Sequence, residues 1–370
     1  MRYNRMFKET NSLTPTTYTQ QLSEYIENLK FEDIPAEVVE RAKMLLIQTM
    51  GAAISAVKTP VAEKILKMGM EANGGFGGDS TVWGTGDKLS TVNAAFVLGT
   101  MCDIQNWEDC SWTGHPAAAA IPCAWLSAAE RNASGKDLIT AIVAAYEAYH
   151  RIAMSVQPTE EQFKLRGWGK NSWQLFAAIL STAKIYGLDA RKINQAIGMG
   201  CEWSTIPTSH HVAESDLGHY EQGFRARDGV LIAKCTEKGI HNCLDAMDAP
   251  LLYAVGMCGK PGTGGPGRIA ENNADMSWLV RNLGTHFYIM DAQIKKPVTL
   301  TEDENVKLIK DLKAGVFVET GDAGKTMAAV VEQFRALTTG LKDDVREQLE
   351  KTLCDIENVE NISAVCSLTY

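Results

Sequence analysis

Three segments rich in small apolar residues, 91–99, 116–130 and 171–187, most constrain what this chain can fold into. We interpret each of them as a helix. Their alanine and glycine residues are small enough to let neighbouring helices pack tightly. Strand-like patterns are few, and the clearest lie at 80–84 and 285–297. No internal repeat is visible. The balance therefore predicts a mainly all-α fold.

The bulk composition is that of an ordinary globular protein. The chain has 370 residues, of which 45% are hydrophobic and 22% charged, enough for one large domain or two. Its net charge of −9 argues against a nucleic-acid-binding surface. The nine cysteines form no C-x-x-C pair and no zinc spacing, so we expect reduced thiols in a cytoplasmic protein. Residues 1–21 lack the apolar stretch of a secretory signal, and no apolar run long enough to span a membrane is present.

The segment 103–116, which lies between two of the predicted helices, is crowded with groups that can do chemistry. They are Asp103, Glu108, Asp109, Cys110 and His115, with Trp107 and Trp112 to exclude water. Catalytic residues are often found on loops that a rigid scaffold positions. The segment is therefore a candidate active-site loop, and the alternative is that its charges only solvate a loop.

A second polar cluster occupies 204–228 and contains His210, His211 and His219 near several carboxylates. Three histidines raise the question of a metal. Their spacing does not match H-E-x-x-H, and adjacent histidines cannot easily ligate one ion from a helix. We therefore predict no metal site in this cluster.

An ion pair is predicted in the long apolar helix 138–154. Glu147 and Arg151 are four residues apart and can meet on one face of that helix. This structural interpretation is favoured over a catalytic role for Glu147.

The order and spacing of several short motifs resemble the MmgE/PrpD family, whose members include 2-methylcitrate dehydratase, cis-aconitate decarboxylase and iminodisuccinate epimerase. The matching pieces include 34–43, 82–84, 93–96, His115-Pro116, 133–138, 145–147 with 151–152, and 183–189. The resemblance covers roughly residues 25–300 and 325–368. It implies a large helical domain with a smaller α/β lid, and an active site between the two.

The resemblance also implies the chemistry. Family members are homodimers that use no metal or organic cofactor and act on small polycarboxylates. A base removes a proton next to a carboxylate, and cationic groups hold the negative charge that develops. We therefore expect a small-molecule carboxylate substrate and a homodimer, with no nucleic-acid or membrane partner.

The domain organisation follows from the same resemblance. We expect an N-terminal tail and first helix start at 1–24, a helical domain at 25–268, a reduced α+β lid at 269–322, and C-terminal helices that return to the helical domain at 323–370. A glycine- and proline-rich loop at 256–267 marks the boundary. Between Pro297 and Ala323 there is too little chain for the usual lid.

The family's site residues carry over incompletely. His115 matches the active-site histidine that precedes a proline, and Lys295 resembles the lysine shortly before a proline in the lid strand. Asn106 stands where the decarboxylase-type pattern has its first aspartate. Gly169 replaces the histidine of a Gly-Trp-His-Pro-Thr pattern, and Gly218 replaces a lysine. Nearby residues that could take over the lost functions are His219, Arg225, Lys170 and Arg166.

We predict a cofactor-independent lyase or isomerase acting by dehydration, decarboxylation or epimerisation on a small carboxylated metabolite. Its general base or acid would be His115, which Asp109 or Glu108 would orient. The candidate site residues are, for catalysis, His115, Asp109, Glu108, Lys295 and His219, and for substrate binding Asn106, Trp107, Trp112, Arg166, Lys170 and Arg225. Two alternatives stay open: the same fold with divergent chemistry on a less charged substrate, and a non-catalytic ligand-binding dimer.

Overall fold

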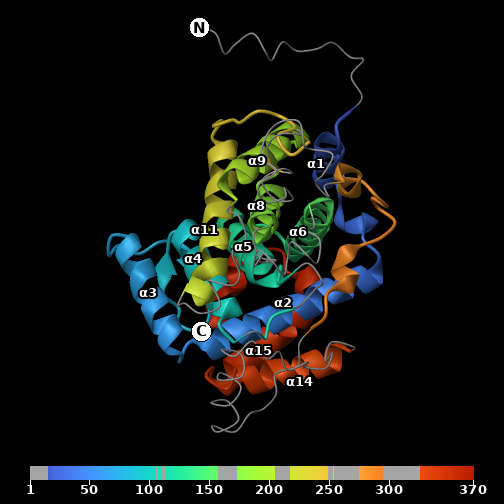
Figure 1. Ribbon diagram of the computed structural model, residues 1–370. Helices are drawn as coiled ribbons and strands as arrows, with labels where there is room; N and C mark the ends of the chain where they lie inside the picture. Colours follow the sequence, from blue (N-terminus) through green and yellow to red (C-terminus); the bar gives the residue numbers. More distant parts are fainter. Residues whose placement is uncertain are drawn as a thin grey trace, which may run out of the picture.

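The computed structural model describes residues 16–105, 107–109, 114–156, 173–204, 217–248, 253, 275–294 and 326–370 (Figure 1). These residues are mostly helical, which confirms the predicted mainly all-α fold. The α-helices are α1 (Tyr18–Asn28), α2 (Ala36–Ala56), α3 (Pro60–Ala72), α4 (Thr91–Asp103), α5 (Ala117–Arg131), α6 (Gly135–Ser155), α8 (Gln174–Ile185), α9 (Ala190–Trp203), α11 (Leu217–Glu237), α14 (Met327–Leu337) and α15 (Asp343–Cys354). The 3-10 helices are η2 (Phe31–Asp33), η4 (Met276–Leu279), η5 (Tyr288–Asp291), η6 (Ile356–Asn358) and η7 (Ile362–Thr369).

The core is a bundle in which α5 packs against α4, α6, α8 and α11. Helix α2 also packs against α4, α5 and α6, and α14 and α15 contact α2 at the lower end of the molecule in Figure 1. At the opposite end, α1 packs against α9. Nearly every residue of α5 and α6 is buried, so side chains that α6 presents to the interior are held in a dry, rigid environment.

Small residues of the segments 91–99 and 171–187 pack tightly against small residues of α11 where α11 crosses α4 and α8. A Cβ atom added at Gly99 of α4 would lie 2.7 Å from the Cβ of Ala226. A Cβ added at Gly223 of α11 would collide with Thr100, and one added at Gly229 would collide with Ala178 of α8. The glycines therefore allow close backbone approach at these crossings.

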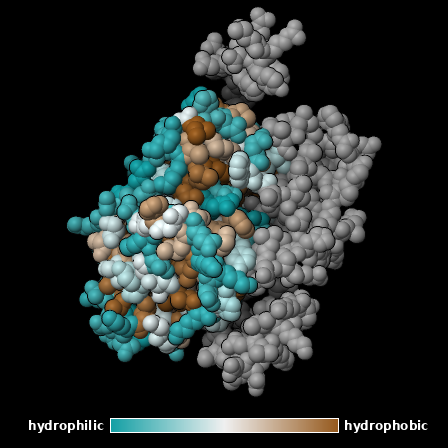
Figure 2. All heavy atoms as spheres, turned by 90° about the vertical axis from the view of Figure 1, so that its left-hand side faces the viewer, coloured by the Kyte–Doolittle hydropathy of each residue, from teal (hydrophilic) through white to brown (hydrophobic). Residues whose placement is uncertain are grey.

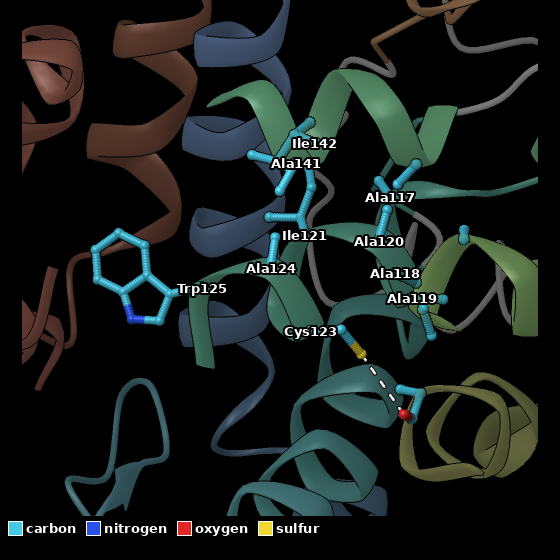
Figure 3. Packing of buried hydrophobic residues seen from close by; sticks show 14 of the residues in the cluster. Ala117, Ala118, Ala119, Ala120, Ile121, Cys123, Ala124, Trp125, Ala141 and Ile142 are labelled. Atoms are coloured by element: carbon cyan, nitrogen blue, oxygen red, sulfur yellow. Dashed lines mark hydrogen bonds between the residues drawn. The ribbon is translucent and has the colours of Figure 1, made fainter. Parts of the chain in front are cut away.

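The first turns of α5 also consist mostly of small side chains (Figure 3). Ala117, Ala118, Ala119 and Ala120 are all fully buried. One turn later, the Cys123 thiol points toward α11 and donates to the carbonyl of Ala226 over 3.5 Å. The N-terminus of α5, which begins directly after His115-Pro116, is thus fixed inside the bundle.

Helix α6 begins with a capping box. The Ser134 hydroxyl accepts from the backbone N–H of Asp137, and the Asp137 carboxylate accepts from the backbone N–H of Ser134. These bonds satisfy donors that a helix start would otherwise leave without partners. From this cap the helix runs 21 residues to Ser155 and carries its buried ionisable side chains, Glu147, His150 and Arg151 among them, in its second half.

The strands in the described residues form one short antiparallel pair, β1 (Ser80–Thr81) with β2 (Lys88–Leu89), in which Ser80 pairs with Leu89, and Gly114 and Gln293 are isolated β-bridge residues. The strand predicted over 285–297 is wrong over Tyr288–Asp291, which forms the 3-10 helix η5, whereas Gln293 beyond it is an isolated β-bridge residue. The backbone N–H of Tyr288 donates to the side chain of Glu147 rather than to a neighbouring strand. Most of the predicted lid, 269–322, lies outside the described residues.

The face over α3, α4 and α11 is mostly hydrophilic, with hydrophobic patches between the polar side chains (Figure 2). Large hydrophobic side chains exposed on these helices include Met68, Met70 and Leu231. Across the part of the chain that the structure describes, no single helix is both long and apolar enough to cross a membrane. Among these described helices, α2 and α3 taken together, with a 92° bend between them, reach that length and composition.

Candidate active site

His115 and the two acidic residues predicted to orient it lie together in the connection between α4 and α5. The Nδ1 atom of His115 lies 2.8 Å from the backbone carbonyl oxygen of Asp109 and 3.2 Å from Oε1 of Glu108. Both partners accept hydrogen bonds, so the neutral ring carries its proton on Nδ1 and its lone pair on Nε2. The ring is thus arranged to act as a base through Nε2.

The two acidic residues differ in how they reach the histidine. Glu108 contacts the ring through its carboxylate. The Glu108 side chain is fully buried, whereas the His115 side chain is 24% exposed. Asp109 uses its main-chain carbonyl instead of its carboxylate. A buried carboxylate beside a partly exposed imidazole stabilises the protonated ring and holds its orientation.

The Asp109 carboxylate forms hydrogen bonds to two helices of the bundle. Its Oδ1 atom accepts from the backbone N–H of Ala117, the first residue of α5, over 3.1 Å, and its Oδ2 atom accepts from the Tyr146 hydroxyl over 2.8 Å. An anion is favoured at a helix N-terminus, where backbone N–H groups point outward. One carboxylate therefore ties this loop to both α5 and α6.

Burial dominates the protonation of this group. It raises the pKa of Asp109 to about 6, although the Tyr146 hydroxyl, the His115 ring and the Ala117 N–H each favour the ionised form. Burial, and next the adjacent Asp109, also raise the pKa of the Tyr146 hydroxyl well above its ordinary value. Tyr146 consequently stays a neutral hydrogen-bond donor.

Tyr146 is the residue of this cluster to which the sequence analysis gave no role. It is 37 positions from Asp109 in the sequence, so no local motif joins the two. The available signal was the concentration of Tyr146, Glu147, His150 and Arg151 within two turns of an otherwise apolar helix.

The predicted ion pair on α6 is present. Arg151 Nη2 lies 3.0 Å from Glu147 Oε2, and both side chains are fully buried. The Arg151 guanidinium also donates to the carbonyls of Arg281 and Asn282, and Glu147 accepts from the backbone N–H of Tyr288. The pair therefore fixes the segment 281–288 on the surface of α6.

Two buried ionisable groups of α6 titrate far from their ordinary pKa values. Burial raises the pKa of Glu147 to about 7 despite the neighbouring Arg151. Burial lowers the pKa of His150 to about 4, although its Nδ1 bonds to the Tyr146 carbonyl. The His150 ring stacks on Tyr288 with 5.6 Å between ring centroids, so it links the 281–288 segment to the turn of α6 that holds Tyr146.

The other predicted site residues are distributed as follows. Trp107 is half-buried beside Glu108 in the chain, and Arg225 lies on α11, where it pairs with Glu221 one turn away. Asn106, Trp112, Arg166, Lys170 and Lys295 lie outside the described residues, and so does the side chain of His219. Among the residues that the structure describes, no group of three or more histidine, cysteine, aspartate or glutamate side chains could hold a metal ion.

Comparison with known proteins adds two findings. Residues 20–263 match the family model described as the MmgE/PrpD N-terminal domain. Cis-aconitate decarboxylase of Aspergillus terreus is 26% identical over 288 residues, which cover 75% of this chain and 56% of that protein. Cis-aconitate decarboxylase of Homo sapiens is 23% identical over 237 residues, which cover 62% of this chain and 48% of that protein. The chain thus matches about half the length of these relatives.

Proposed function

The chain belongs to the MmgE/PrpD family, and from that premise we propose that it is a lyase or isomerase that moves a proton at a carbon next to a carboxylate of a small metabolite. The observation that carries the proposal is the contact of His115 Nδ1 with Glu108 and with the Asp109 carbonyl. It sets the tautomer that a general base needs. The relatives named as cis-aconitate decarboxylases support the carboxylate class of the substrate.

The chemistry proceeds through the Nε2 lone pair of His115. In an elimination or epimerisation, Nε2 takes the proton from the carbon next to the carboxylate, and the C–H electron pair moves into the carboxylate system. In an elimination this pair then forms the C=C bond while the hydroxyl on the neighbouring carbon takes up a proton and leaves as water, and in an epimerisation the carbon is reprotonated on its opposite face. In a decarboxylation, the protonated ring gives its proton to the carbon that loses CO2. In either direction Glu108 stabilises the imidazolium, and proton transfer by a positioned acid or base such as this histidine typically contributes about 10²–10⁴-fold.

We assign substrate binding to the cationic and aromatic residues that the sequence predicted for it. Arg225, Arg166, Lys170 and Lys295 would pair with substrate carboxylates and with the charge that develops on them. Trp107 would help to exclude water. A homodimeric state and a cytoplasmic location stay predictions from the family resemblance and the composition.

The test is proton NMR of the full chain in D2O with a panel of citrate-, aconitate- and succinate-like acids. We expect deuterium incorporation or product formation on one acid, and loss of that signal in His115→Gln. The matched control is His241→Gln, which removes an exposed histidine beyond the end of α11. An active His115→Gln enzyme would overturn the proposal. Silence of the wild-type chain across the panel would instead favour a less charged substrate or a non-catalytic binding protein, as the changes at Asn106, Gly169 and Gly218 would allow.

A further inference from the structure

Tyr146 connects the helical core to the histidine of the candidate site. We propose that Tyr146 is a positioning residue for His115 and acts through Asp109, an inference that rests on the proposed function. Its phenol does not have to touch a substrate for this role. It fixes the residue whose main chain holds the base.

The connection consists of two hydrogen bonds that join Tyr146 to His115 through Asp109, and a third that holds the Asp109 carboxylate from α5. The Tyr146 hydroxyl donates to Asp109 Oδ2 over 2.8 Å, and the backbone N–H of Ala117 donates to Oδ1 over 3.1 Å. With both carboxylate oxygens held, the peptide of residue 109 is fixed as well. Its carbonyl oxygen then accepts from His115 Nδ1 over 2.8 Å. A displacement of the Asp109 side chain is therefore passed to the imidazole.

Packing alone does not account for a tyrosine at this position. The ring is fully buried and stacks with His150, and a phenylalanine would fill the same space. A buried hydroxyl costs free energy unless it forms a hydrogen bond. The bond to Asp109 supplies that compensation, and it places the hydroxyl between the core and the loop that carries His115.

The charges around Asp109 give the hydroxyl a second effect. Glu108 and His115 face Asp109 from the same loop, Tyr146 faces it from α6, and Arg41 of α2 acts on Tyr146. A buried carboxylate with fewer donors takes up a proton more readily. A protonated Asp109 would have to donate a hydrogen bond and would rearrange, which would loosen its hold on the loop.

The test compares two tyrosine-to-phenylalanine variants on one helix. Tyr146→Phe removes the donor to Asp109, whereas Tyr149→Phe removes an equally buried hydroxyl that accepts from Trp173 Nε1 over 3.1 Å. Both variants lose a hydroxyl that forms a buried hydrogen bond, so a purely structural effect would appear in both. With the acid that is turned over, we expect Tyr146→Phe to lower kcat about 10- to 100-fold with little change in KM, and Tyr149→Phe to change neither.

A measurement on the ring itself separates this inference from the proposed function. In ¹⁵N-histidine NMR spectra of the full chain, with His115 assigned by loss of its signals in His115→Gln, we expect wild type and Tyr149→Phe to show the Nδ1-protonated tautomer. Tyr146→Phe should shift both ring nitrogens toward values of mixed tautomers. If no acid is turned over, the proposed function fails and these spectra still decide the role of Tyr146.

A double-mutant cycle tests the route through Asp109. If Tyr146 acts through that carboxylate, adding Tyr146→Phe to Asp109→Asn should change kcat and the His115 spectrum far less than it does in the wild-type chain. Identical His115 spectra in Tyr146→Phe and wild type, or additive effects in the cycle, would overturn the inference.

Discussion

Two fully buried carboxylates lie at the same stretch of α6, Glu147 on the helix itself and Asp109 against Tyr146. The cost of burying them is compensated in different ways. Glu147 is paired with a cation, Arg151, and the pair is saturated with backbone hydrogen bonds from 281–288. Asp109 instead has a tyrosine hydroxyl and a backbone N–H, both neutral, and its loop also holds a partly exposed histidine. The ion pair neutralises the charge of Glu147 and fixes the segment 281–288. The hydrogen bonds to Asp109 come from neutral donors, so the charge of Asp109 stays close to His115, a group that exchanges protons.

The largest expected effect tests whether the Glu147–Arg151 pair is structural. Arg151→Met removes the cation and leaves Glu147 buried without it, which should cost about 3–5 kcal/mol in the free energy of unfolding at pH 8. Urea unfolding followed by circular dichroism measures this. The control is Arg335→Met, whose pair with Glu350 is exposed and should contribute little to the unfolding free energy. Equal losses of unfolding free energy in the two variants would show that the buried Glu147–Arg151 pair is no more important for stability than an exposed pair.

The second prediction uses pH to examine the Asp109 cluster. Because the pKa of Asp109 in the folded protein is raised to about 6, folding takes up a proton, and this contribution to stability is fully present below pH 3.8 and is lost as the pH rises through 6. Asp109→Asn has no such group. The unfolding free energy of wild type minus that of Asp109→Asn should therefore fall between pH 4 and 7, by an amount on the order of 3 kcal/mol.

Urea unfolding of both proteins at several pH values gives this difference. Because every other titrating group is common to the two proteins, His150, whose lowered pKa acts in the opposite direction, largely cancels. A difference that stays constant with pH would contradict the assignment. A decrease confined to the range above pH 8 would point to a different group.

The smallest effect tests whether the two clusters depend on α6 in the same way. Ser134→Ala removes the capping hydroxyl at the far end of the helix and should cost about 1 kcal/mol in the unfolding free energy. It leaves the contacts of Tyr146 and Arg151 in place, so the His115 NMR signals should match those of wild type. Altered His115 signals would show that the loop depends on the helix as a whole and not on one hydroxyl.

The sequence was sufficient for the parts of the fold that depend on local pattern. The segments 91–99 and 116–130 became α4 and α5 because their small apolar residues favour tightly packed helices, and the pairing of Glu147 with Arg151 follows from helical spacing. His115, Glu108 and Asp109 could be grouped in advance because they lie within eight residues of one another. Their role in catalysis stays a prediction.

Long-range contacts explain where the sequence was insufficient. The 3-10 helix at Tyr288–Asp291 forms where Glu147, 141 positions away, accepts the Tyr288 N–H, and no periodicity within 285–297 indicates this. The same holds for Tyr146, whose partner is 37 positions away. The hydrophobic pattern of α6 predicted a helix correctly but gave no information about which of its polar side chains face the loop.

Because a main-chain carbonyl holds His115, substituting side chains cannot test every contact of this histidine. Every amino acid at position 109 supplies the same carbonyl oxygen, so an alanine scan deletes the carboxylate but never the acceptor that contacts the ring. Such a scan would underestimate the contribution of residue 109 to holding the His115 ring. Backbone chemistry, such as an ester in place of the amide that follows Asp109, would weaken this acceptor while leaving every side chain of the site intact.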